Sequence, residues 1–109
     1  MTVLTEGRAM KALKYLAETD ESCAELKADL ARKEAKIKST ESTVFLHTTG
    51  TVAERNAYAD TNPDTLAANE EYFKAIRAYN AVANKRSTES ILIEAWRSVN
   101  SSRKKGNII

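Results

Sequence analysis

A chain of 109 residues, 42% of them hydrophobic and 29% charged, has the size and composition of one globular domain and not of a disordered segment. Three glycines and one proline are too few for a sheet protein with many tight turns, so the composition predicts long helices. The formal charge of +2 is too small to indicate nucleic-acid binding by the chain as a whole.

Apolar residues recur at steps of seven through the first half of the chain. The row consists of Leu16, Cys23, Leu30, Ile37 and Val44, with Ala9 one step earlier. Such a repeat keeps one seam of a helix against a partner, so it predicts a helix over about residues 3–48 and assigns the row to helix packing and oligomer contacts. Lys33 and Thr40 interrupt the neighbouring row, which argues against a long, isolated two-stranded coiled coil. The threonines after Ser39 are poor helix formers, so this end of the helix is the part most open to fraying.

Two stop-and-restart signals follow this helix. Gly50 suits a left-handed helix end, Thr51 can cap a new helix, and Glu54 stands at the capping-box position. They predict a short helix over about residues 52–60. Asn62 then serves as a cap before a proline at the first position of the third helix.

The third helix is predicted over about residues 63–103, with a frayed basic tail at 103–109. The polar stretch 84–90 permits two interpretations: a continuous helix with a solvated patch, or a fresh helix capped by Ser87 or Thr88. We favour the continuous helix because no glycine or proline enforces a break.

Charge is divided along the first helix. Acidic residues prevail over 18–29 and basic residues over 32–38. Folding the chain back at 50–63 would set the basic part near the acidic pair 70–71, and the acidic part near the basic pair 85–86. The fold class predicted is therefore all-α: a single domain forming an elongated antiparallel helical hairpin, two long helices joined by a short one. The same split would also serve an antiparallel homodimer.

A lone hairpin buries only one stripe of each helix, so we expect the hairpin to assemble into a dimeric helical bundle. Cys23 is the only cysteine and cannot form a disulfide within the chain, which favours a reducing, cytoplasmic setting. Charged residues interrupt the N-terminal segment, and no run approaches the roughly 20 apolar residues that span a bilayer. Neither export nor membrane insertion is expected.

Catalytic groups are scarce. His47 is the only histidine, lies near the end of the first helix and is 24 positions from Cys23, so the two cannot form a nucleophile and base within one chain. No metal-ligand spacing and no glycine-rich phosphate loop is present. We therefore expect a non-enzymatic protein with no catalytic residues, metal or cofactor.

The C-terminal part is the only basic pole. Trp96 could stack on a base while nearby cations meet phosphates. The alternative, which we favour, is that Trp96 packs beside Leu92 and Val99 while the cations suit a helix C-terminus. Packing between helices is likewise favoured over base stacking for Tyr72 and Tyr79. The residues of the nucleic-acid hypothesis are Lys85, Arg86, Trp96, Arg97, Arg103, Lys104 and Lys105.

Two segments carry a resemblance: residues 94–103 (EAWRSVNSSR) and 53–59 (AERNAYA). With the layout of long, short and long helix, they resemble small helical proteins of the early, recombination-associated regions of bacteriophages and prophages. The resemblance implies a phage-encoded, non-enzymatic accessory protein in the bacterial host cytoplasm, linked to DNA recombination or replication. It supplies no catalytic residues.

Our leading hypothesis from the sequence is an oligomeric helical protein that presents a surface to another protein. The alternative is direct nucleic-acid binding by the basic end of the third helix.

Overall fold

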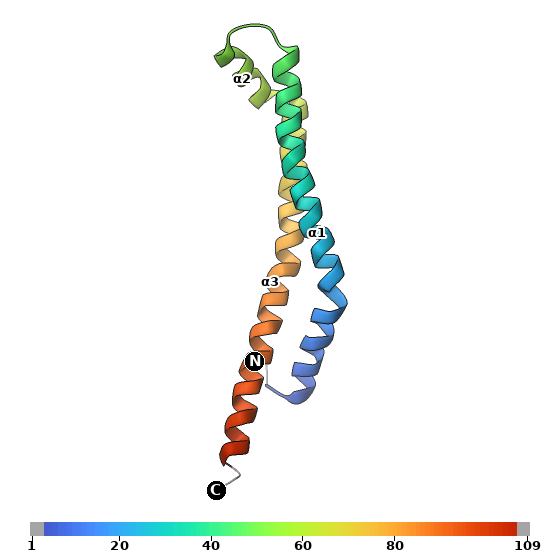
Figure 1. Ribbon diagram of the computed structural model, residues 1–109, viewed down its shortest axis with the longest axis vertical. Helices are drawn as coiled ribbons and strands as arrows, with labels where there is room; N and C mark the ends of the chain where they lie inside the picture. Colours follow the sequence, from blue (N-terminus) through green and yellow to red (C-terminus); the bar gives the residue numbers. More distant parts are fainter. Residues whose placement is uncertain (1–3, 107–109) are drawn as a thin grey trace. The chain divides into compact units, whose positions relative to one another are not determined.

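Three helices make up nearly all of the chain in the computed structural model, which describes residues 4–106, with side chains described through Lys104. The helices are α1 (Glu6–His47), α2 (Val52–Thr61) and α3 (Pro63–Gly106), so the short α2 joins the two long helices in chain order (Figure 1). Within the described range there is no strand. The predicted all-α class, with two long helices joined by a short one, is confirmed.

The turns before α2 and α3 have the chemistry that their sequences indicate. Thr51 is the N-cap of α2, where its Oγ1 accepts a hydrogen bond from the Glu54 amide at 3.2 Å. Gly50 has φ +123°, in the left-handed region that favours glycine. Before α3, the Asn62 Oδ1 accepts a hydrogen bond from the Asp64 amide at 2.8 Å. These local bonds satisfy amides that a helix start leaves without an intrahelical partner.

Helix α1 does not fray after Ser39 but continues to His47, close to its predicted end at about residue 48. The Thr43 hydroxyl donates to the Ser39 carbonyl at 2.8 Å, and the Thr48 hydroxyl donates to the Val44 carbonyl at 2.6 Å. Both threonines thus bond to a carbonyl four residues earlier, as they do when accommodated along a helix.

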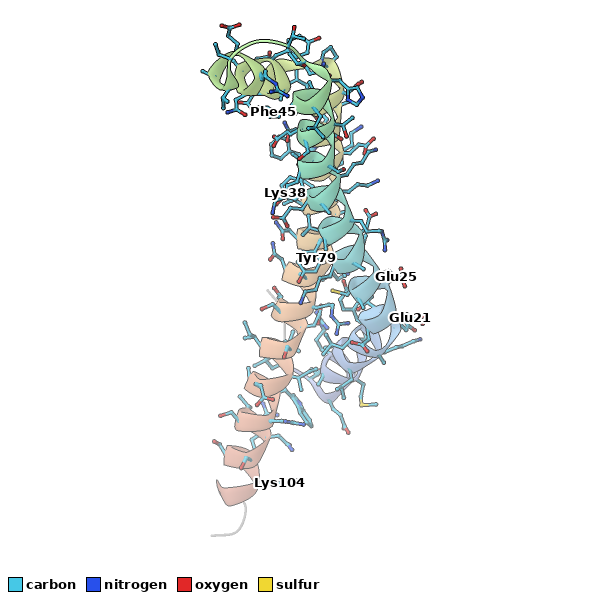
Figure 2. All side chains as sticks on the ribbon, turned by 45° about the horizontal axis from the view of Figure 1, so that its top comes forward. Glu21, Glu25, Lys38, Phe45, Tyr79 and Lys104 are labelled. Carbon is cyan, nitrogen blue, oxygen red and sulfur yellow. The ribbon has the colours of Figure 1, made fainter. Side chains whose placement is uncertain are left out.

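Arg55 of α2 provides a second reason for the stable end of α1. Its Nε and Nη2 atoms donate to the Phe45 carbonyl at 3.1 and 2.8 Å. The guanidinium also lies over the Phe45 ring, 4.1 Å from its centroid, and Phe45 is labelled near α2 in Figure 2. Since the last carbonyls of a helix lack intrahelical donors, this contact both caps α1 and fastens α2 to it.

Helix α3 is continuous through residues 84–90. The Thr88 hydroxyl donates to the Asn84 carbonyl at 3.1 Å, which is the bond of a threonine inside a helix. The alternative of a fresh helix capped by Ser87 or Thr88 is therefore wrong. The helix also extends past its predicted end near 103 to Gly106, and residues 107–109 of the predicted tail lie outside the described residues, as do residues 1–3.

The chain divides into two compact units, which we describe separately. The unit Ala24–Asn80 contains the second part of α1, all of α2 and the first part of α3. Here Lys36 Nζ lies 3.0 Å and Lys33 Nζ 3.8 Å from Glu71 Oε2. The hydrogen bond from Lys36, followed by its charge, lowers the pKa of Glu71. The predicted approach of the basic part of α1 to the acidic start of α3 is thus observed.

The other unit contains residues 4–23, which include the first part of α1, and residues 81–106 of α3. Arg8 contacts Glu89, and Asp20 contacts Arg86. Later residues of α1 thus meet earlier residues of α3, so the helices run antiparallel within this unit (Figure 1).

Small side chains dominate the interior. Among described residues, the buried apolar side chains are Ala9, Ala12, Ala59, Ala68, Ala75 and Ile93. An alanine removes far less apolar area from water than a leucine or phenylalanine, and hydrophobic stabilisation scales with that area. The packing within one chain therefore uses only part of the apolar surface that the sequence supplies.

Candidate interaction surfaces

Each long helix carries a row of residues at seven-residue steps that is at least half-buried. On α1, Ala9 is buried and the remaining members are half-buried: Leu16, Cys23, Leu30, Ile37 and Val44. This is the pattern expected of the packing role predicted for them. On α3 the corresponding row, which the sequence interpretation did not assign, consists of Thr65, Tyr72, Tyr79, Arg86 and Ile93. This second row is hard to predict from the sequence because Thr65 and Arg86 interrupt its apolar pattern.

Arg86 binds α1 through both terminal nitrogens of its guanidinium. Its Nη1 donates to the Leu16 carbonyl and to Thr19 Oγ1, both at 2.7 Å, and its Nη2 lies 3.2 Å from Asp20 Oδ1. The side chain is only 22% exposed. A guanidinium whose donors are committed in this way holds the two helices in register.

A second polar contact joins the start of α1 to α3. Arg8 Nη2 donates to Glu89 Oε1 at 2.7 Å, and the Glu89 side chain is 8% exposed. The hydrogen bond from Arg8 is the main reason that the pKa of Glu89 is lowered, against the opposing effect of burial. The other carboxylate oxygen, Oε2, is buried without a protein partner among the described residues. The ionised carboxylate is thus held mainly by Arg8, with a smaller contribution from the charge of Lys85.

Lys85 is exposed, and its Nζ lies 4.5 Å from the centroid of the Tyr15 ring. A lysine over an aromatic face is attracted by the ring quadrupole. The two members of the nucleic-acid hypothesis that come first in the chain, Lys85 and Arg86, are thus both engaged with α1.

The remaining members lie further along α3. Trp96 is half-buried, and Arg97 Nη1 lies 3.1 Å from Glu94 Oε1 on the same helix. Arg103 and Lys104 are exposed on the final turns, which extend past the start of α1 (Figures 1 and 2). The side chain of Lys105 lies outside the described residues. The exposed basic surface is therefore confined to the end of α3, and Arg86 is not part of it.

Several large apolar side chains stay in contact with solvent. The exposed ones among described residues are Met10, Leu13, Leu46, Val52, Tyr58, Leu66, Phe73 and Ile91. Leu66 and Phe73 stand out because they lie seven residues apart on α3, on one side of the helix, and are 52% and 51% exposed. From the sequence, Leu66 and Phe73 are predicted to lie in the third helix, but no surface is indicated for them.

The two residues considered for nucleophilic chemistry are in ordinary surroundings. His47 is exposed at the end of α1, where its Nδ1 lies 2.8 Å from the Thr43 carbonyl oxygen. Cys23 is half-buried on the α1 row. A shallow polar groove of about 480 Å³ beside His47 is lined in part by Thr43, Tyr58 and Asp64. Between residues 4 and 106, no group of three or more His, Cys, Asp or Glu side chains could hold a metal ion.

No helix in the described part of the chain combines the length and apolarity needed to cross a membrane. Comparisons with protein-family models, with curated proteins and with solved structures gave no match. The resemblance to early-region phage proteins accordingly stays a prediction.

Proposed function

We propose that this protein is a non-catalytic helical interaction protein that self-associates and presents helix surfaces to another protein. The observation that carries the proposal is the contrast between its interior and its surface: the interior is mostly alanine, while leucine, methionine and phenylalanine side chains are exposed. Single exposed apolar residues are normal, but an interior this poor in large side chains leaves much of the available hydrophobic stabilisation unused.

The geometry of the helices supports the same proposal. Both long helices are regular over more than forty residues, and their rows at steps of seven are only half-buried. Half-buried positions can be covered further when another helix packs against the pair, as in helical bundles. Sites for chemistry are instead expected to be concave and to bring several polar groups together.

Sedimentation equilibrium of the full chain over a wide range of concentration tests this proposal. We expect the average mass to rise from one chain toward a multiple of it as concentration increases. A mass of one chain throughout the micromolar range would overturn the proposal of self-association.

Direct nucleic-acid binding is a second candidate, supported by the exposed Arg103 and Lys104 on turns of α3 that extend past α1. Fluorescence anisotropy with single- and double-stranded oligonucleotides would detect it, and phosphate contacts would make affinity fall steeply with salt. The double variant Arg103→Ser with Lys104→Ser should then bind more weakly than a control that loses the same charge, Lys27→Ser with Lys38→Ser. Absence of binding at low salt, or equal loss in both variants, would count against this end of α3.

A further inference from the structure

A second row of residues on α3, distinct from the row that faces α1, lies within the unit Ala24–Asn80. Its spacing alternates three and four residues: Leu66, Asn69, Phe73, Ile76 and Asn80. Leu66 and Phe73 are about half exposed, Asn80 is exposed, and Asn69 and Ile76 are half-buried. This alternation is the pattern of a helix surface that packs on another helix.

Two residues of opposite charge border this row on the side that points away from α1. Glu70 and Arg77 are exposed, lie seven residues apart and therefore point to the same side of α3. Among the described residues neither is in an ion pair, in contrast to neighbouring Glu71, which is bound by lysines of α1. The charges are thus free to meet charges on another molecule.

We propose that a second copy of this chain packs along this row, with the two α3 helices antiparallel about a two-fold axis between Lys74 and Ala75. This proposal rests on the self-association proposed above and identifies the surface through which two copies associate. In this register the row is complementary to itself: Phe73 meets Ile76 of the second copy, and Asn69 meets Asn80. Each contact occurs twice, as the symmetry of a two-fold interface requires.

The charges select this arrangement. In an antiparallel pair with the register above, residues on the outer border face each other, so Glu70 lies opposite Arg77 of the second copy and Arg77 opposite its Glu70. In a parallel pair, the border with Glu70 and Arg77 faces the other border of the partner's row, which carries Thr65 and Tyr72. Glu70 then lies opposite Thr65, and Arg77 lies opposite Tyr72. The antiparallel pair therefore matches both charges, whereas the parallel pair matches neither.

Charge reversal tests the proposal directly by sedimentation equilibrium. Glu70→Arg makes both border residues positive and Arg77→Glu makes both negative, so each variant repels its own copy, and we expect its dissociation constant to rise about tenfold or more. An equimolar mixture of the two single variants should recover association, because every contact is again between opposite charges. The double variant Glu70→Arg with Arg77→Glu should also associate, since the pairs are merely exchanged.

An apolar variant provides an independent test on the same helix. Phe73→Ala should weaken association about tenfold or more, because an aromatic side chain at the centre of the contact is lost. Ile91→Ala is the matched control, since Ile91 is 67% exposed on α3 but lies outside the row. Circular dichroism should give the same helix content for both variants as for the unaltered chain.

The outcomes separate this proposal from the one on which it rests. An unaltered chain that is always a monomer would overturn both. A chain that associates, while its charge variants and Phe73→Ala associate equally well, would overturn this surface and leave self-association standing. Recovery in the mixed sample but not in either single variant would establish the antiparallel contact.

Discussion

Arg86 occupies a position in the α3 row where helices in close contact usually carry an apolar side chain. The cost of withdrawing its charge from water is offset by three acceptors on α1: the Leu16 carbonyl, the Thr19 hydroxyl and the Asp20 carboxylate. Because the three acceptors lie within about one turn of α1, the guanidinium reaches them together only when Arg86 faces this turn. Arg86 thus contributes specificity as well as contact.

We expect Arg86→Ala to lower the free energy of unfolding by about 1.5–3 kcal/mol, the usual contribution of hydrogen bonds to a charged group. Arg86→Met should cost less, because it keeps the packing of the side-chain stem. Urea unfolding followed by circular dichroism measures both. The control is Arg97→Ala, whose ion pair with Glu94 is exposed and should change stability by less than about 1 kcal/mol. Equal stability of Arg86→Ala and the unaltered chain would contradict this role.

Glu89 makes the stability of the protein depend on pH. Its pKa is lowered in the folded chain, chiefly by the hydrogen bond from Arg8, so the folded state favours the ionised carboxylate. The stabilisation is therefore fully present above the ordinary pKa of glutamate and is lost as pH falls through the lower folded value.

Glu89→Gln should accordingly be less stable than the unaltered chain at neutral pH, and the difference should shrink on acidification below about pH 4. Urea unfolding at a series of pH values measures this difference, with Glu94→Gln on the exposed side of α3 as control. A difference that stays constant from neutral to acidic pH would show that ionisation of Glu89 does not stabilise the fold.

The roles of single polar residues were the least predictable from the sequence. The sequence groups Arg86 with Arg103 and Lys104 because all three are basic and lie in the last quarter of the chain, yet only Arg103 and Lys104 are exposed. A usable signal existed, since Arg86 lies seven residues after Tyr79. It could not be interpreted from one helix alone, because the value of a buried guanidinium depends on acceptors that only the register with α1 supplies.

At the scale of helices and turns, Gly50 and Gly7 offer a matched comparison. Gly50 has φ +123°, and a Cβ built there would lie 2.8 Å from Glu54 Oε2. Gly7 lies in the first turn of α1, where the nearest atom to such a Cβ is Thr5 Oγ1 at 3.9 Å. Alanine is strained at the first position and fits the second.

Gly50→Ala should therefore lower the free energy of unfolding by about 1 kcal/mol or more, whereas Gly7→Ala should raise it by about 0.5–1 kcal/mol. Urea unfolding of the two variants beside the unaltered chain gives both signs. The same sign for both substitutions would mean that backbone conformation at Gly50 does not govern the turn.

Element boundaries were predictable where they depend on neighbours in sequence. Gly50, Thr51 and Asn62 act through bonds within a few residues, and the turns they predict are present. The end of α1 was less predictable, because its stability depends on Arg55 reaching the Phe45 carbonyl from another helix. Helix propensity describes a segment by itself and cannot include a cap that packing supplies.

At the scale of the whole molecule, the fold class followed from composition and the row of seven-residue steps, since both reflect local helix formation. The identity of the buried side chains could not be predicted in the same way. The row on α1 is half-buried and the buried apolar positions are mostly alanine. A heptad pattern identifies the side of a helix that packs but not how many partners cover it. The number of partners must therefore be measured on the protein in solution.

If association completes the burial of apolar surface, stability must depend on protein concentration, because binding between folded chains shifts the folding equilibrium by mass action. We expect the midpoint of thermal unfolding to rise by several degrees over about a hundredfold range of concentration. Circular dichroism melts at each concentration measure it. The dependence should be weaker for Phe73→Ala and retained for Ile91→Ala, because only Phe73 lies in the proposed contact. A midpoint independent of concentration in the unaltered chain would show that its folded state does not rely on a second copy.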